Sequence, residues 1–294
     1  MKIAVELQQA IREKQRNGHE GNATARLLDA GEGWRVVDVL CTSGPDDRPF
    51  EERHEKVSIS IVAAGTFQYR TTRHAEFMSP GSFLLGHPNL AYECAHEHGT
   101  GDRCISFQFS AEAFERITQT RPLFRPQRLP PLRDSAPLAA RACAALARGQ
   151  ASWEELAVAV AARTVQLANG VMLEQQRAPL HAAARVTRAI RLLERRPAVS
   201  LQSLSKDAGL SPYHFLRTFT QLTGTTPHQF AMRARLREAA VQLTADRDRI
   251  IDVALDCGFG DVSNFNRAFR AEFGVSPRRF KKEMLRSPSK HSGA

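Results

Sequence analysis

One short segment of the sequence carries four side chains of types that bind metal ions. The segment "AYECAHEHGTGDRCISF" supplies Cys94, His96, His98 and Cys104. If Tyr92 to His98 is a β-strand, its cysteine and two histidines point to one face, because side chains alternate along a strand. Two thiols and two imidazoles suit zinc or another borderline-soft ion. The spacing is not that of a usual zinc finger, so hydrogen-bonded polar side chains or part of an effector site explain it equally well.

A second group of residues occurs twice, fifty positions apart. "YHFLRTFTQLTGTTPHQF" begins at Tyr213 and "SNFNRAFRAEFGVSPRRF" begins at Ser263, and each has an arginine between two phenylalanines. At about 100° per helical residue the phenylalanines share the buried side and the arginine lies opposite them. The inward residues are Phe215, Phe219, Phe265 and Phe269, and the outward ones are Arg217 and Arg267.

An outward arginine on such a helix has two interpretations. Its planar fork can donate two hydrogen bonds to guanine O6 and N7 in the DNA major groove. Alternatively it pairs with a phosphate or with a neighbouring carboxylate, which conveys no base sequence. Matched arginines on matched helices favour a base or near-base contact.

The residues around each repeat predict the elements that hold it. A short apolar helical segment and a glycine, Gly209 or Gly258, precede each repeat, which predicts two helix-turn-helix motifs. Ser205 and Ala254 fall where small side chains let the two helices cross closely. Upstream of the phenylalanines the offset is forty-nine, so the second turn has one extra residue. Thr226 and Ser276 begin the next helices, each followed by a proline, Pro227 or Pro277.

The positive charge of the chain lies in this same region. Residues 1–180 hold 21 Lys and Arg against 21 Asp and Glu, while residues 181–294 hold 20 against 10. A neutral half joined to a basic half suggests a polyanion partner for the second half alone. Charge alone is equally compatible with a basic solvated surface.

Composition excludes several classes of protein. The 294 residues suggest two domains, and 42% apolar with 24% charged residues is typical of globular proteins. No stretch is apolar enough to span a membrane, and the N-terminus has no secretory apolar core. Five scattered cysteines indicate reduced thiols rather than a disulfide framework. We therefore expect a cytoplasmic protein.

Short alternating runs between Trp34 and Ser110 predict strands of a sandwich or small barrel. Five prolines in "RPLFRPQRLPPLRDSAP" forbid continuous helix or sheet there. A helix follows, whose apolar stripe packs on the N-terminal domain, forms a dimer surface, or does both: Trp153, Leu156, Val160, Thr164, Leu167 and Val171. The first thirty residues read as weakly helical and poorly ordered.

We divide the chain into an extension (1–30), a sensor domain (31–120), a linker and helical connector (121–180), a DNA-binding domain (181–285) and a tail (286–294).

From residue 182 to 285 the sequence resembles the AraC/XylS family of bacterial transcription regulators. The resemblance is carried by "SLQSLSKDAGLSPYHFLRTFTQLTGTTPHQF", "RLREAAVQL" and "IIDVALDCGFGDVSNFNRAFRAEFGVSPRRFKK". It implies a seven-helix domain whose two recognition helices, joined by a long helix, enter successive major-groove turns of double-stranded operator DNA. By position, base reading is implied for Tyr213, Leu216, Arg217, Ser263, Asn266 and Arg267. We expect DNA backbone contacts from Thr220, Arg270, Arg278, Lys281 and Lys282.

The β-rich half is similar to the cupin-type sensor domain common in this family, which implies a small effector and often a homodimer. We therefore expect an α+β protein: a cupin-like barrel, a helical connector and an all-α tandem helix-turn-helix domain. Contact with RNA polymerase and association with the nucleoid are further expectations. The alternative is a metal- or thiol-dependent sensor or a cupin-type enzyme, for which only His54 and Glu55 match the early metal motif. We expect no enzymatic activity and no cofactor beyond a metal ion at the cysteine and histidine segment.

Overall fold

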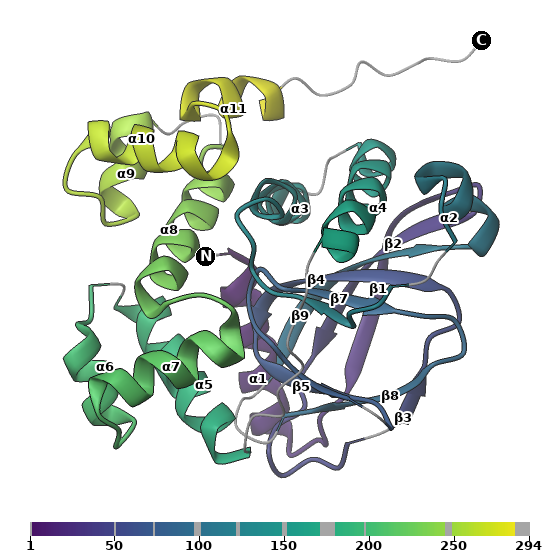
Figure 1. Ribbon diagram of the computed structural model, residues 1–294, viewed down its shortest axis with the longest axis horizontal. Coiled ribbons are helices and arrows are strands. Elements are labelled where there is room, and N and C mark those ends of the chain that lie inside the picture. The colour runs from purple at the N-terminus through teal and green to yellow at the C-terminus, as the bar shows by residue number, and fades with distance from the viewer. Residues whose placement is uncertain are drawn as a thin grey trace.

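The computed structural model describes residues 2–49, 51–72, 74–96, 101–121, 124–148, 152–170, 180–196, 198–244 and 249–285 (Figure 1). Its N-terminal half contains two antiparallel sheets. The six-stranded sheet has the order β1 (Ala23–Gly31), β2 (Trp34–Cys41), β9 (Asp102–Phe109), β4 (Val57–Gly65), β7 (Phe83–Gly86) and β10 (Arg128–Leu129). The four-stranded sheet has the order β3 (Glu51–Arg53), β8 (Ala91–Ala95), β5 (Phe67–Arg70) and β6 (Ala75–Met78).

The two faces of the six-stranded sheet differ in polarity. On β4, Ile59 and Ile61 are fully buried in the core that the sheet shares with helices. Ser58 and Ser60 alternate with them and therefore point to the opposite face. That face turns towards the four-stranded sheet, where a small second core contains Val62 and other residues of both sheets. The apolar face is thus outside the barrel under helices, and the inner face carries hydroxyl groups.

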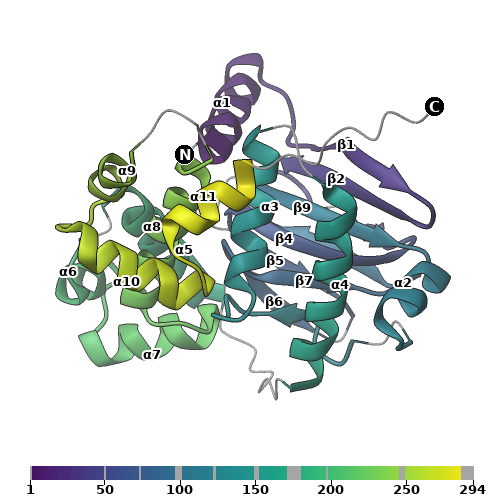
Figure 2. The ribbon, with the colours of Figure 1, turned by 90° about the horizontal axis from the view of Figure 1, so that it is seen from above.

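Four helices belong to this half: α1 (Lys2–Asn17), α2 (Ala111–Thr118), α3 (Ala136–Arg148) and α4 (Trp153–Gly170). Figure 2 shows α3 and α4 lying across the six-stranded sheet. Trp153, Leu156, Val160 and Thr164 are buried, and the first three pack into the core beneath α4. The stripe of α4 therefore packs on the N-terminal domain within one chain, and its predicted continuation at Val171 lies outside the described residues.

The C-terminal half contains seven helices among residues 180–285, which matches the expected number: α5 (Leu180–Arg195), α6 (Leu201–Asp207), α7 (Pro212–Thr223), α8 (Pro227–Gln242), α9 (Ile250–Asp256), α10 (Val262–Phe273) and α11 (Pro277–Leu285). They form two separate apolar cores, one around Phe215 and one around Phe265. Helix α8 runs between the two cores (Figure 1). The expected α+β fold is confirmed.

Two local expectations were wrong. The first thirty residues are not a poorly ordered extension, because α1 buries Ile3, Leu7 and Ile11 in the main core and β1 pairs with β2. The strand expected from Tyr92 to His98 ends at Ala95, and His96, the next residue, is not part of a strand. None of the described helices is long and apolar enough to cross a membrane.

Candidate nucleic-acid interface and sensor interior

The first helix-turn-helix motif is built from α6 and α7. Ser200 caps α6, and the chain then turns at Gly209, whose φ of +63° is costly for residues with a side chain. Ser211 begins α7 by accepting a hydrogen bond from the backbone N–H of His214 at 3.3 Å, with Pro212 at the first helical position. The expected cap, turn and start are all present.

The second motif repeats this geometry with α9 and α10. Gly258 takes the turn position with φ of +79°, and Asp261 caps α10 through the N–H of Asn264 at 2.6 Å. The backbone N–H of the residue after each glycine bonds back to the small crossing residue: Leu210 to Ser205 at 3.0 Å, and Phe259 to Ala254 at 2.9 Å. The turn from glycine to cap is one residue longer in the second motif, as expected.

The phenylalanines fix each recognition helix to its own core. Phe215 and Phe219 are fully buried with ring centroids 5.8 Å apart, and Phe265 and Phe269 are fully buried at 5.5 Å. The inward half of each predicted helix wheel is therefore present in the structure. The side of each helix opposite its phenylalanines faces outward.

The outward residues are exposed to different degrees on the two helices. Helix α10 exposes Ser263, Asn266, Arg267 and Arg270. Helix α7 exposes Tyr213, at 69%, and Arg217, whereas Leu216 and Thr220 are half-buried. Neither Arg217 nor Arg267 forms an ion pair with any residue that the structure describes. No carboxylate in the described part of the chain pairs with either arginine, so the structure does not support the interpretation that each one pairs with a neighbouring carboxylate.

Helix α8 joins the two motifs. Thr226 and Gln229 form a reciprocal capping box at 3.2 and 3.1 Å, with Pro227 buried at the first position. Its 16 residues make it about 24 Å long. Ser276 begins α11 through the N–H of Arg279 at 3.3 Å, and Pro277 is buried. On α11, Arg278 and Lys282 are exposed and Lys281 is half-buried.

A segment of the N-terminal half holds both recognition helices at their C-terminal ends. Buried Arg128 donates from Nη1 to the carbonyl oxygen of Leu222, near the end of α7, at 2.5 Å. Arg133 donates to the carbonyl of Ala271, near the end of α10, at 2.6 Å. We call residues 128–133 the clamp segment. Cationic donors at helix C-termini are favourable because those carbonyls lack partners within the helix.

The clamp segment is itself anchored on both sides. Nη1 of Arg128 also donates to the carbonyl of Phe77 in β6, at 2.6 Å, and Arg233 of α8 donates to the carbonyl of Pro131. Pro130 lies against Gly224, the residue that ends α7 with φ of +75°. Burial lowers the pKa of Arg128, and Glu76, 3.6 Å away, opposes that effect.

The barrel interior holds a group of aromatic and polar side chains. Nε2 of His54 shares a hydrogen bond with the Tyr69 hydroxyl at 3.0 Å, and Nδ1 shares one with the Ser58 hydroxyl at 3.1 Å. The imidazole ring also stacks on Tyr92, with ring centroids 4.1 Å apart. Burial, with a smaller effect of His87, lowers the pKa of His54 to about 4. Burial also raises the pKa of the Tyr69 and Tyr92 hydroxyls. These groups are neutral at pH 7, so the interior offers neutral hydrogen-bonding groups.

The cysteine and histidine segment is arranged differently from the expected single strand. His96 lies just after β8 and bonds through Nε2 to Oδ2 of Asp102 at 2.7 Å, with Cys41 beside both residues. Burial works against the charged imidazole, but Asp102 and Cys41 outweigh it and raise the pKa of His96 to about 10. Cys104 donates to Oδ1 of Asp102 at 3.3 Å. Cys94 is half-buried nearby, in the smaller core, and His98 lies outside the described residues.

The sequence did not lead us to predict several residues of these sites. Asp261 could have been found, because an acidic residue directly before an amphipathic helix is a common cap. Cys41 and Asp102 could not, because they are 61 positions apart and meet only through the β2–β9 register. Nothing in the sequence separates Arg128 and Arg133 from other linker arginines.

Comparison with known proteins agrees with both halves. Residues 204–283 match a helix-turn-helix domain family, and residues 37–164 match the AraC-like ligand binding domain. The chain is 41% identical over 83 residues to "Probable transcriptional regulator LumQ" of Photobacterium leiognathi, covering 28% of this chain and 33% of that protein. It is 30% identical over 89 residues to "Probable transcription factor PqrA" of Proteus vulgaris, covering 30% of this chain and 73% of that protein. The chain thus spans about a third of the first of these relatives.

Among solved structures, an AraC-type transcriptional regulator from Chromobacterium violaceum is 26% identical, with 36% of this chain and 95% of that chain covered at a TM-score of 0.33. A ligand-binding β domain followed by two helix-turn-helix motifs defines a class of protein, the two-domain transcription regulators. Within that class the chain belongs to the AraC/XylS family, as its resemblance predicted.

Proposed function

We propose that the protein is a sequence-specific, effector-responsive transcription regulator that binds double-stranded operator DNA. Helices α7 and α10 enter two successive turns of the major groove on one face of the duplex. The observation that carries the proposal is the pair of exposed arginines, Arg217 and Arg267, on two helices that each follow a glycine turn, begin at a side-chain cap and are anchored by two buried phenylalanines. Neither arginine is paired within the described chain, so both are available to a polyanion.

Base reading is assigned to three residues on each helix. On α10 they are Ser263, Asn266 and Arg267, and on α7 they are Tyr213, Leu216 and Arg217. Asn266 can bond an adenine edge, whereas half-buried Leu216 offers only apolar contact, for example with a thymine methyl. Helix α10 therefore contributes more hydrogen bonds to the bases than α7 does.

Phosphate contacts are assigned to residues that flank these. Arg270 lies on the exposed side of α10, and Arg278 and Lys282 are exposed on α11. Thr220 and Lys281 are half-buried and are assigned with them. Such contacts raise affinity for any DNA and make binding depend on salt.

The effector binds on the inner face of the barrel. Support comes from the polarity of that face: Ser60 and Ser106 share a buried hydrogen bond at 3.0 Å, and His54 with Tyr69 and Ser58 adds neutral donors and acceptors. A neutral polar molecule matches this set better than an ion does. Its binding biases the position of the clamp segment, and through it the two recognition helices.

At the level of the cell, we propose a cytoplasmic, nucleoid-associated homodimer that contacts RNA polymerase and has no enzymatic activity. Family membership and the names of the relatives as regulators support this part. Activation and repression both fit it.

Sequencing of DNA bound by the full-length chain tests the proposal. Genomic fragments selected by the purified protein should share two short motifs about one helical turn, or 10 to 10.5 base pairs, apart. Equal recovery of all fragments, without any enriched motif, would contradict sequence-specific binding. The genes beside the recovered sites would then indicate the class of effector.

A further inference from the structure

We propose that Cys41, His96 and Asp102 form a binding site for a borderline-soft divalent metal ion such as Zn²⁺. The inference goes beyond the proposed function, since neither DNA binding nor a neutral polar effector requires a metal. The site keeps His96 of the set expected from sequence and adds Cys41 and Asp102, which were not expected.

The topology brings these three residues together at one end of the barrel. Cys41 ends β2 and Asp102 begins β9, and the two are direct partners in the antiparallel register. Their side chains therefore lie on the same face of the sheet. His96 arrives from the other sheet, directly after β8, so the three residues join the two sheets of the barrel.

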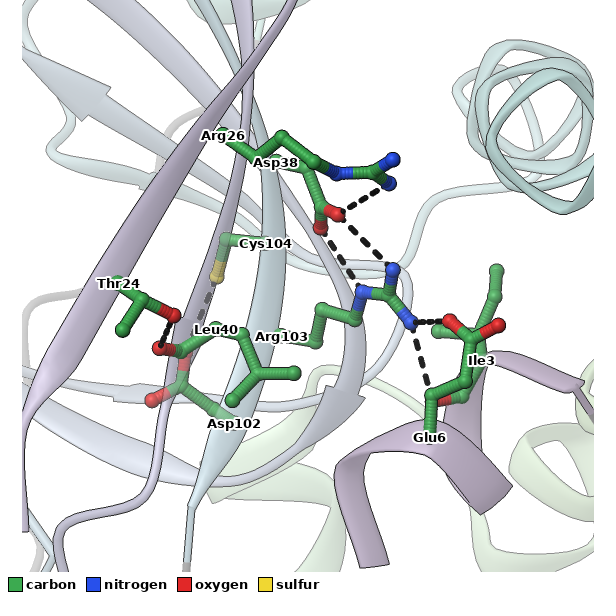
Figure 3. A network of polar contacts seen from close by, with 9 residues as sticks. All are labelled: Ile3, Glu6, Thr24, Arg26, Asp38, Leu40, Asp102, Arg103 and Cys104. Carbon is green, nitrogen blue, oxygen red and sulfur yellow. Dashed lines mark hydrogen bonds and ion pairs between the residues drawn. The ribbon is translucent and has the colours of Figure 1, made fainter. Parts of the chain in front are cut away.

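The face in question is the inner one. Figure 3 shows Asp102 and Cys104 on one side of β9, while Arg103 points to the other side, where it binds Asp38 and Glu6. The Arg103 guanidinium is thus fully engaged in a separate outer network. It does not neutralise the inner carboxylate.

The donor atoms are close enough to be drawn onto one ion. Cys41 Sγ, a ring nitrogen of His96 and a carboxylate oxygen of Asp102 lie within 4.8 Å of one another. Tetrahedral zinc, with bonds of 2.0 to 2.3 Å, needs ligand atoms about 3.5 Å apart. A contraction of about 1 Å therefore completes the site, and the 2.7 Å pair of His96 and Asp102 is already closer than that.

The nitrogen of His96 that can share an ion with Asp102 is Nε2, which lies 2.7 Å from Oδ2 of that carboxylate. Nδ1 points to the opposite side of the ring and takes no part in the site. A metal ion bound at Nε2 would take the place of the proton that His96 and Asp102 share, in a site where both residues are only 5% exposed.

Charge and donor chemistry agree with a divalent, borderline-soft ion. A thiolate, a neutral imidazole and a carboxylate carry two negative charges, which one divalent cation neutralises in a site where no ligand is more than 6% exposed. On binding, the Cys41 thiol and the His96 imidazolium each release one proton to solvent. Sulfur with nitrogen suits zinc or cobalt better than magnesium or calcium. Cys104 lies beside the site and donates to Oδ1 of Asp102 at 3.3 Å, but it is not one of the three ligands.

The test is a titration of the full-length, reduced protein with Co²⁺ and Zn²⁺ in the absence of DNA. We expect one equivalent of Co²⁺ per chain, a thiolate-to-cobalt absorption band, and displacement of cobalt by zinc. His96→Gln and Cys41→Ser should each weaken binding by more than about tenfold, the least that loss of a supporting residue costs at metal sites. Cys257→Ser is the matched control, since Cys257 is equally buried but lies in the core of the second helix-turn-helix motif.

Circular dichroism of each variant establishes that it is folded, and Asp102→Asn gives a third variant if either of the others fails to fold. A folded wild-type chain that binds no equivalent of either metal would overturn the proposal. So would binding that survives both His96→Gln and Cys41→Ser. Because DNA is absent, either result leaves the DNA-binding proposal untouched.

Discussion

At the scale of single residues, the proposed function assigns Arg267, which is exposed on α10, to base reading. Arg267→Ala should weaken binding to the operator by about 1 to 3 kcal/mol and relax the preference at one base pair. The measurement is a set of equilibrium affinities for the operator and for each single-base variant at the assigned position.

Lys282→Ala is the matched control for this substitution, because Lys282 is exposed on α11 and is assigned to phosphate. It should weaken binding to all DNA by a similar factor and reduce the slope of log affinity against log salt by about one. If both variants lost affinity equally on cognate and random DNA, the assignment of Arg267 to a base would be wrong.

His54 makes the stability of the folded protein depend on pH in the mildly acidic range. Its pKa in the folded chain, about 4, lies below the value of about 6.5 in an unfolded chain, so the unfolded state takes up a proton first. The neutral form therefore contributes its full stability above pH 6.5, and that contribution is lost progressively as the pH falls from 6.5 towards 4. The free energy of unfolding should drop by roughly 2 kcal/mol between pH 7.5 and pH 5 because of this residue.

Urea unfolding at a series of pH values checks this prediction. His54→Gln should flatten the curve in that range, while His228→Gln, at an exposed position of α8, should leave it unchanged. An unaltered slope in His54→Gln would assign the acid sensitivity to other groups.

At the scale of elements, the glycine between α6 and α7 sets the direction of the first recognition helix. A methyl group added at Gly209 would meet no atom within 4 Å, so only the φ of +63° opposes a substitution. Gly209→Ala should destabilise the protein by about 1 to 2 kcal/mol. Thermal or urea unfolding measures this.

Gly170 at the end of α4 is a suitable control, because an added methyl group there is also free of contacts and its φ is not positive. Gly170→Ala should be neutral or slightly stabilising. Equal effects of the two substitutions would show that backbone conformation is not what holds the turn.

The helices of the C-terminal half could be predicted from sequence because their signals are local. Ser211 with Pro212, Thr226 with Pro227, and the glycines in the turns act within a few residues, and all are found where they were expected. The strands between residues 34 and 109 were also predicted in outline. In contrast, β1 and the packing of α1 were missed, because they depend on a partner strand and on a core assembled from distant segments.

The inner residues of the barrel show the same limit more sharply. Sequence spacing suggested that Cys94, His96 and His98 share one strand face, but β8 ends at Ala95. The true neighbours of His96 come from β2 and β9, through a register that no local pattern reveals. The proposed metal site therefore retains His96 but takes its other ligands, Cys41 and Asp102, from β2 and β9.

At the scale of the whole molecule, the clamp segment directly joins the β-rich half to both helix-turn-helix motifs. Its Arg128 side chain donates to carbonyls of β6 and of α7, which places one buried guanidinium between the two halves of the chain. Arg128→Met should leave both carbonyls without a donor and speed amide hydrogen exchange in the last turn of α7. Hydrogen exchange with mass spectrometry, resolved to peptides, measures this change.

The same experiment on Arg133→Ala provides the comparison, because Arg133 reaches α10 instead. Faster exchange should then appear at the end of α10 and not in α7. A uniform increase across both motifs in either variant would mean that the clamp acts on global stability rather than on one helix at a time.

The extra residue between Gly258 and Asp261 has a consequence for engineering. Two residues lie between Gly258 and Asp261, the cap of α10, whereas one lies between Gly209 and Ser211, the cap of α7, so the two recognition helices follow turns of different length. The two reading units are therefore not interchangeable cassettes. Placing the side chains of Ser263, Asn266 and Arg267 on α7 would transfer the residue types without the turn that positions them on α10. A change of operator preference therefore has to be designed separately for each recognition helix.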